Sequence, residues 1–316
     1  MGNIFYTNLF EDSFKKLEGR IVNTPWRDKV SENSCSFKVG DNMPPSNTKD
    51  YKERLLQTLK EIFGISNSSF DKKFYQVING AGQEWKRLNV FHSSSLLCLL
   101  CFYNISEQAP LNITIDGKVC RFTASEFEVL NEIGKNKRHY PYYSHIDVKL
   151  SGLCEGKSVS LYLESKFSEY VNQRGAQKFT STEEYELIYS KLDREIEGLD
   201  ISTDDDKIIL KNIDNKRPAQ YWQGIKQMVS HYLGMKNCKD TSDIKYLGEI
   251  LYDFRSSIME PDYFRAYEKI HQQLVKALEE REPKPQTFKV GKNMMTYQDI
   301  FKNYSLDERV REIYNL

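Results

Sequence analysis

The spacing of hydrophobic and polar residues changes near residue 110, where a helical period gives way to the alternation of strands. Between Tyr51 and Phe63, apolar residues recur at the spacing of one helix face, which predicts an amphipathic helix. The segment 70–105 predicts two further helical pieces, joined or bent near the Asn-Gly-Ala-Gly run at 79–82. Residues 1–50 are mostly polar and irregular, so the helical part of this first third begins at Tyr51.

The segment 111–167 consists of short strand-like runs separated by turns. Asp116 and Gly117 lie between two such runs, and Asp-Gly is among the strongest short signals for a β-hairpin. The last two strands are joined by a glycine-containing loop of hairpin length. Beyond the hairpin at Asp116, the alternation predicts strands at 125–133, 144–150 and 158–167.

The second half of the chain returns to helical spacing, with one further strand. The best-defined helix spans 217–234, with Pro218 in its first turn and Gly234 at its carboxyl end. A strand is predicted at 244–254. Further helical signals lie at 181–199 and 263–280, with two short ones in the tail 295–316. This order predicts an α/β (α+β) fold, with a central mixed β-sheet flanked by helices.

Three parts of the chain are expected to form one compact domain. Residues 1–65 form an N-terminal extension of loop and helix, residues 66–275 form the core, and residues 276–316 form a C-terminal helical tail. The chain has 316 residues and 13% aromatic residues, enough apolar material for a packed core. Its net charge of zero gives no general basic excess, so nucleic-acid binding would depend on local patches.

The six cysteines are scattered, and their positions do not predict a zinc site. Cys98 and Cys101 lie in the apolar run LLCLLCF and are predicted to be core residues of a helix. The other four are predicted to be reduced thiols of an intracellular protein. No run approaches the roughly 20 apolar residues of a membrane helix, and the N-terminus lacks the pattern of a signal peptide. The expected location is the cytoplasm, without membrane association.

The strand 158–167 ends in a group of residues that could carry chemistry. A period of two places Glu164 and Lys166 on one face, and Asp147 lies in the preceding strand. Two carboxylates can hold a divalent cation that activates water and polarises a phosphate, while a lysine orients the water or neutralises developing charge. Acid-any-lysine triplets are common in this chain, so the competing interpretation is an exposed edge strand with a solvated Glu–Lys face.

The segments SHIDVKL and LYLESKF, with the hairpin loop between them, resemble the core of the PD-(D/E)xK nuclease superfamily, whose fold is restriction-endonuclease-like. The resemblance covers roughly residues 74–254. It implies that Asp147 and Glu164 are metal ligands and that Lys166 is the catalytic lysine. Ile146 stands where the proline that gives the family its name would be.

Two flanking segments extend this resemblance. Glu84, in GAGQEWKRLNVFHSSS, resembles the helical acid that reaches the metal in a bacterial branch of the superfamily; the competing interpretation is a surface carboxylate. Gln227 resembles the helical residue that holds the attacking water or a phosphate, with an ordinary helix surface as the alternative. His231 lies one turn later and is predicted to be a structural histidine. The serines after His92 are predicted to cap the next helix.

A cluster of cations precedes the strand of Asp147. Lys135, Lys137 and Arg138 are followed by three tyrosines, a combination that suits backbone phosphates and base stacking. Lys226, beside Gln227, is a further candidate for phosphate contact. The competing interpretation of the cluster is a solvated loop.

The first functional hypothesis is a DNA endonuclease, restriction-like or DNA-processing, that depends on Mg²⁺ or Mn²⁺. In it, Asp147, Glu164 and Glu84 bind the metal, while Lys166 and Gln227 assist the reaction. The second hypothesis is a catalytically inactive module of the same fold that binds nucleic acid or protein. RNA is a third, weaker choice of substrate. Cutting both strands of a duplex usually needs two active sites, which makes a homodimer compatible with the first hypothesis.

Overall fold

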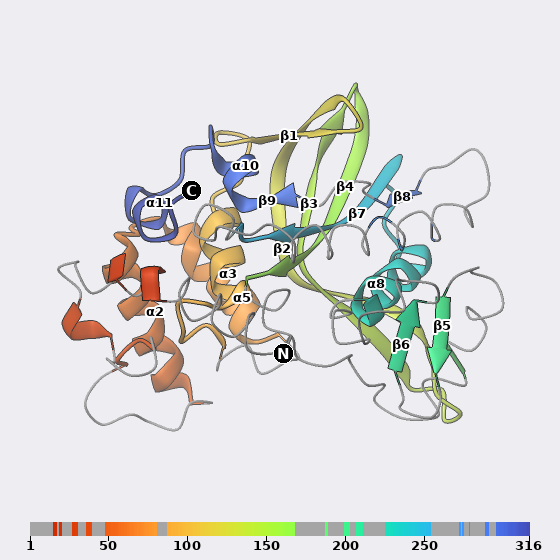
Figure 1. Cartoon of the computed structure of the whole chain (residues 1–316), viewed down its shortest axis with the longest axis horizontal. Helices are drawn as coiled ribbons and strands as arrows, with labels where there is room; N and C mark the ends of the chain where they lie inside the picture. The colour runs from red at the N-terminus through yellow and green to blue at the C-terminus, as the bar shows by residue number, and fades with distance from the viewer. Residues whose placement is uncertain are drawn as a thin grey trace, which may run out of the picture.

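The computed structural model shows a layered arrangement of helices and one large sheet (Figure 1). Glu84 lies outside the residues that the structure describes, as do nearly all of the predicted helices 181–199 and 263–280. Only the backbone is described for 27, 199–202, 207–210, 225–226 and 288–290. The described residues are 15–17, 19–20, 27–30, 36–39, 48–80, 87–167, 187–188, 199–202, 207–210, 225–253, 272, 274, 278, 288–290 and 295–316.

The predicted N-terminal helices form, and their ends are fixed by side-chain caps. α2 (Lys49–Phe63) begins after Thr48, whose hydroxyl accepts from a backbone N–H, and ends at Gly64 with a φ of 69°. α3 (Ser68–Ile78) is capped by the side chain of Asn67. α5 (Ser94–Phe102) is capped by Ser93, which confirms the predicted role of the serines after His92. A short 3-10 helix, η1 (Arg27–Lys29), precedes them.

Among the described residues, seven strands form one mixed sheet, in agreement with the predicted fold class. The first four make an antiparallel meander, and β7 lies parallel to β4 on its other side. β8 and β9 both pair with β7 in parallel. The strands are β1 (Leu111–Ile115), β2 (Lys118–Lys135), β3 (Pro141–Cys154), β4 (Lys157–Lys166), β7 (Ile244–Leu251), β8 (Phe288–Val290) and β9 (Met295–Thr296); β5 (Leu199–Ser202) and β6 (Lys207–Leu210) form a separate pair.

Two tight turns set the register of the meander. Asp116 and Gly117 connect β1 to β2, and Glu155 and Gly156 connect β3 to β4. All four residues have positive φ, as a two-residue type I′ turn requires. The hairpin predicted at Asp116 is therefore confirmed, and the second turn is shorter than the predicted loop because β3 continues to Cys154.

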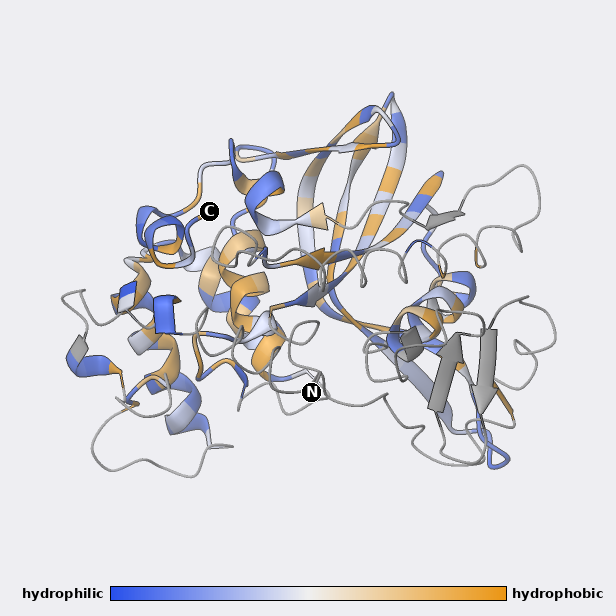
Figure 2. Cartoon of the chain, in the orientation of Figure 1, coloured by the Kyte–Doolittle hydropathy of each residue, from blue (hydrophilic) through white to orange (hydrophobic). Residues whose placement is uncertain are grey.

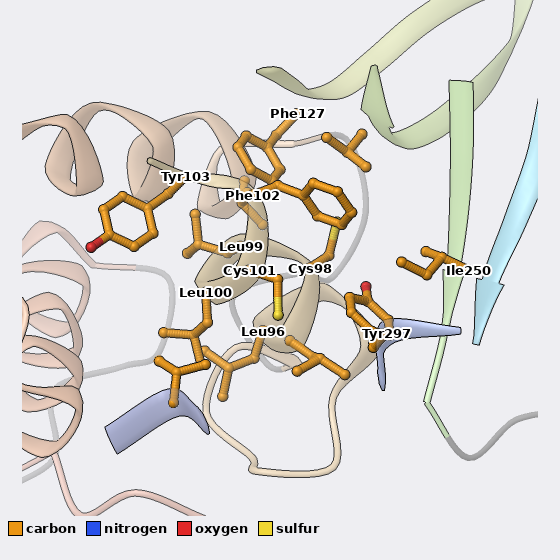
Figure 3. Packing of buried hydrophobic residues seen from close by; sticks show 14 of the residues in the cluster. Leu96, Cys98, Leu99, Leu100, Cys101, Phe102, Tyr103, Phe127, Ile250 and Tyr297 are labelled. Atoms are coloured by element: carbon orange, nitrogen blue, oxygen red, sulfur yellow. The ribbon is translucent and has the colours of Figure 1, made fainter. Parts of the chain in front are cut away.

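The core lies between the helices and one face of the sheet. All nine residues of α5 are buried, and Figure 3 shows Cys98 and Cys101 among leucine and aromatic side chains. Figure 2 shows the same helix as a continuous hydrophobic element, while the strands alternate in hydropathy. The prediction that these two cysteines are core residues is confirmed.

The prediction that the remaining cysteines are reduced thiols is wrong for two of them. Cys120 and Cys154 form a disulfide between β2 and β3. They are direct partners in the register, with their Cα atoms 4.3 Å apart, so the sheet itself brings the sulfurs together. Sequence separation hid this pair, because the two cysteines are 34 positions apart and most of both long strands lies between them.

β4 differs from the predicted half-buried strand. It lies between β3 and β7, and its residues are buried on both faces from Val159 to Lys166. The interpretation as an exposed edge strand with a solvated Glu–Lys face is therefore wrong. A parallel neighbour and helices on both sides explain why even its polar residues are inaccessible.

α8 (Ile225–Asn237) continues past the predicted end at Gly234. A Cβ at Gly234 would come within 2.3 Å of the Ser144 hydroxyl and 2.8 Å of Asn131, so this glycine permits close packing of the helix on β2 and β3. Its role is close approach rather than helix termination.

The C-terminal tail joins the core. The two predicted helices form as α10 (Tyr297–Phe301) and α11 (Glu308–Tyr314), and the Tyr314 hydroxyl donates to the Phe91 carbonyl. α11 lies beside α2, so both ends of the described chain contribute to the same face. Within the described residues, no helix combines the length and apolar character needed to span a membrane.

Candidate active site

The candidate site lies at the carboxyl end of β4, in the centre of the sheet. Glu164 and Lys166 are 3% and 5% exposed, respectively. β3 and β7 flank the strand, and α8 supplies side chains from a neighbouring layer (Figure 1). A carboxylate and an ammonium group at such depth require partners, because an unpaired buried charge is strongly unfavourable.

Both oxygens of Glu164 have such partners. Oε1 accepts from Lys166 Nζ and from Gln227 Nε2, each at 2.7 Å. Oε2 lies 2.9 Å from His231 Nε2. Lys166 Nζ also donates to Gln227 Oε1 at 2.7 Å, which closes a ring of three side chains. Gln227 and His231 are one turn apart on α8, so one helix face contacts both oxygens of this carboxylate.

This network makes Glu164 an anion under all ordinary conditions. Burial alone would raise its pKa, but Lys166 and His231 outweigh burial and lower the pKa from 4.5 to about 2. Gln227 therefore lies beside Glu164 and Lys166, while its predicted role in holding the attacking water or a phosphate stays a prediction. His231 contacts the candidate metal ligand through Nε2, but its buried Nδ1 has no hydrogen-bond partner among the described residues, so it is not the fully satisfied structural histidine that was predicted.

A second polar network fixes α8 over β4. The Tyr162 hydroxyl donates to Asp240 at 2.5 Å, just beyond the end of the helix. Lys149 of β3 lies 3.0 Å from the same carboxylate. Burial raises the pKa of Asp240, but hydrogen bonds from Tyr162, Ser160 and Ser242 outweigh burial and lower it. Gln227 and His231 are thereby held at a defined position relative to the strand.

Asp147 lies beside Glu164, where the pairing of β3 with β4 ends. The described pairing of the two strands ends at Val148 and Leu163, and the two acids are the next residues along. Asp147 Oδ2 accepts from the Ser165 backbone N–H at 2.7 Å. Burial raises the pKa of Asp147 well above its usual value, and the negative charges of Glu164 and Glu128 raise it further.

Two further acids in this part of the sheet were not predicted. Glu128 lies in β2 opposite Asp147, because the residues on either side of Glu128 pair with those on either side of Asp147. Its φ is 51°, although it lies in the middle of a strand. Glu249 of β7 is the direct register partner of Glu164 and is 1% exposed. Glu249 lies inside the apolar run LGEIL, so the sequence contained a signal for it. Glu128 lies among alternating polar residues, and the sequence contained no such signal there.

Four acids on four adjacent strands therefore align across the sheet: Glu128, Asp147, Glu164 and Glu249. Within the described part of the chain, no three His, Cys, Asp or Glu side chains are grouped closely enough to form a metal cage. The arrangement is a row in which each acid lies on the strand next to that of the following one, rather than a closed cluster.

The other predicted residues lie apart from this row. Lys135, Lys137 and Arg138 occupy the end of the β2–β3 hairpin, seven or more residues along either strand from the acids. The side chain of Lys226 and the whole of Glu84 fall outside the described residues.

No family of proteins, no curated protein and no solved structure matched this chain.

Proposed function

We propose that this protein is a metal-dependent DNA endonuclease that hydrolyses phosphodiester bonds. The residues that carry the reaction would be those where the pairing of β3 with β4 ends. The observation that supports this most is the placement of Asp147 beside Glu164, with Lys166 bonded to Glu164. The strand order also supports it: a helix, an antiparallel meander, α8, and then β7 parallel to β4. The resemblance to the PD-(D/E)xK superfamily implies the same order.

The chemistry of the two carboxylates fits Mg²⁺ or Mn²⁺. Burial raises the pKa of Asp147, the charges of neighbouring acids raise it further, and a cation would relieve this repulsion. Mg²⁺ usually binds through one or two carboxylates together with water and substrate phosphate, so a closed protein cage is not required. Asp147 and Glu164 would hold the cation, which when bound polarises a phosphate oxygen and promotes ionisation of water.

The remaining residues have separate roles. Lys166 places a positive charge at the same carboxylate oxygen that Gln227 contacts, where it can neutralise charge on a pentavalent phosphorus. Gln227 binds both members of the ion pair and so fixes their relative orientation. His231 holds the other oxygen of Glu164, which orients the carboxylate.

The second candidate is a catalytically inactive module of this fold that binds nucleic acid or protein. One observation favours it: Glu164 and Lys166 are deeply buried and satisfy each other. Such a pair can serve to specify the packing of α8 on the sheet without any chemistry.

Cleavage of supercoiled plasmid DNA with Mg²⁺ or Mn²⁺ tests the proposal. The decisive variant is Asp147→Asn, because the amide oxygen can still accept from the Ser165 N–H while the charge is lost. We expect nicked or linear product with the wild type and a loss of at least about 100-fold with the variant, the scale of removing one preorganised charge. Wild-type protein that binds DNA but never cuts with either metal would support the inactive module instead.

A further inference from the structure

The end of the β2–β3 hairpin, residues 130–145, forms an arm whose outer surface differs from the rest of the molecule. Five large hydrophobic side chains are exposed in the described part of the chain, and three of them lie here. Tyr140 is 65% exposed, Leu130 47% and Tyr143 45%. Soluble proteins expose single apolar residues freely, but a group of them on one element indicates a surface for binding.

The same arm carries a local excess of positive charge. Lys135, Lys137 and Arg138 lie at its tip, and Glu132 is its only acidic residue. Glu132 lies 3.8 Å from Lys135, at the upper limit for an ion pair. In a chain of zero net charge, this excess favours an anionic partner. Figure 2 shows the tip as a hydrophilic end on a hairpin whose body alternates in hydropathy.

The tip is a defined turn that places Tyr140 at a fixed position. Asn136 accepts from the backbone N–H groups of Arg138 and Tyr140 through its side chain, both at 2.9 Å. Its own N–H donates to the Tyr140 carbonyl at 2.9 Å. His139 completes the turn with a φ of 63°. A rigid platform loses little entropy when an aromatic ring stacks on a ligand.

The inner surface of the arm packs on α8, which connects it to the candidate site. Asn131 and Ser144 are buried against Gly234, and Asn237 donates to the Glu132 carbonyl at 3.2 Å. Figure 1 shows the hairpin extending past α8, which contacts both of its strands. The helix that supplies Gln227 and His231 to Glu164 therefore also sets the position of the arm.

We propose that this arm binds unpaired bases of a DNA substrate, with Tyr140 and Tyr143 stacking on bases and the cations contacting phosphates. Exposed tyrosines among lysine and arginine match the chemistry of single strands, where bases offer a flat surface for stacking. A duplex hides that surface, so the arm would select a duplex that opens into a single-stranded tail. This inference deepens the proposed nuclease function and rests on it for the choice of DNA.

The fold also sets the distance at which the tail should begin. Tyr140 and Asp147 are separated by seven residues along β3, which corresponds to about 23 Å at roughly 3.3 Å per residue. At about 3.4 Å per nucleotide, this distance spans about seven nucleotides of B-form DNA. Unpaired bases are therefore expected about seven nucleotides from the scissile phosphate.

Fluorescence anisotropy in EDTA tests the inference without any cleavage. The probes are a labelled blunt duplex and the same duplex with a single-stranded DNA tail. We expect the wild type to bind the tailed probe at least about fivefold more tightly, equivalent to one stacked base at the low end of its range. The double variant Tyr140→Ala/Tyr143→Ala should lose this preference, while Tyr140→Phe/Tyr143→Phe should keep it because the rings remain.

The matched control is Leu153→Ala, which removes an exposed apolar side chain from the opposite end of β3 and should change nothing. Equal binding of the two probes by the wild type, or an undiminished preference in the alanine variant, would overturn the inference. Tighter binding to a tail of RNA than of DNA would overturn the choice of DNA. If the protein prefers the tailed probe through its tyrosines but never cuts DNA, the inference about the arm stands and the proposed nuclease function is rejected.

Discussion

The candidate site and the arm carry similar kinds of residues in opposite surroundings. At the site, Glu164 and Lys166 are buried, and their polar atoms bond to each other and to α8. On the arm, Lys137 and Arg138 are exposed beside Tyr140. An ion pair in water contributes little to stability, whereas a buried charge is strongly destabilising once its partner is removed. Substitutions should therefore affect folding at the site and binding at the arm.

The largest effect on stability should come from Lys166→Ala. Removal of this ammonium group leaves Glu164 buried without its closest cation, which typically costs about 3–5 kcal/mol. Urea unfolding followed by circular dichroism measures the loss. The double variant Glu164→Gln/Lys166→Met removes both charges and should recover most of the stability. A single variant as stable as the wild type would show that the pair is more hydrated than its burial indicates.

A smaller effect is expected at the other oxygen of Glu164. His231→Leu removes a hydrogen bond to a buried carboxylate and should lower the free energy of unfolding by about 1.5–3 kcal/mol. His231→Gln can still donate to Oε2, so it should retain most of that stability in the same urea titration. If the leucine and glutamine variants were equally stable, the bond from His231 would have no role in holding the carboxylate.

Acid titration distinguishes the two carboxylates at the site, because their pKa values shift in opposite directions. The pKa of Glu164 is lowered to about 2, so its contribution to stability is present above about 4.5 and is lost as the pH falls toward 2. Glu164→Gln should remove this part of the acid-induced loss when thermal unfolding is followed across that range. If the variant lost as much stability as the wild type over the same acidic range, the lowered pKa of Glu164 would be contradicted.

Asp147 should show the reverse behaviour. Its raised pKa means that ionisation opposes folding, so stability is lost as the pH rises from the usual aspartate value through the raised one. Asp147→Asn should consequently raise the thermal midpoint at neutral pH in the absence of metal. The gain should shrink when Mg²⁺ is added, because the cation binds the wild type more tightly and so stabilises it more than the variant. A variant that melts below the wild type would contradict this.

The smallest effect on stability is expected on the arm. Lys137→Gln/Arg138→Gln should change the free energy of unfolding by less than about 0.5 kcal/mol, as for most surface substitutions. DNA binding should weaken, and the slope of log affinity against log salt should decrease by about 1.4–1.8 if both residues contact phosphates. Anisotropy at several salt concentrations measures this slope. An unchanged slope would remove these two residues from the DNA interface.

Much of the fold followed from local patterns. The helix at Tyr51, the hairpin at Asp116 and the strand at Ile244 are each specified by nearby residues, through periodicity or turn chemistry. The disulfide between Cys120 and Cys154 was missed because it depends on the register of two long strands, which no local pattern specifies.

The candidate site shows the same division. Glu164 and Lys166 share a face because a strand has a period of two, and this was visible in the sequence. The burial of both residues was not, since it depends on β7 arriving from more than 70 residues later to cover the strand. The position of Glu249 beside Glu164 comes from the same long-range pairing, and the contact from His231 comes from the packing of α8 on the sheet, so only the folded chain reveals these two contacts.

Calorimetric titration with Mn²⁺ tests the central claim most directly, because it measures the metal at Asp147 and Glu164 without requiring the right DNA. The wild type should bind the ion, and Asp147→Asn should bind it at least about tenfold more weakly, the scale of losing about 1.4 kcal/mol of interaction. Equal binding by the two proteins, or no binding by a folded wild type, would contradict the account.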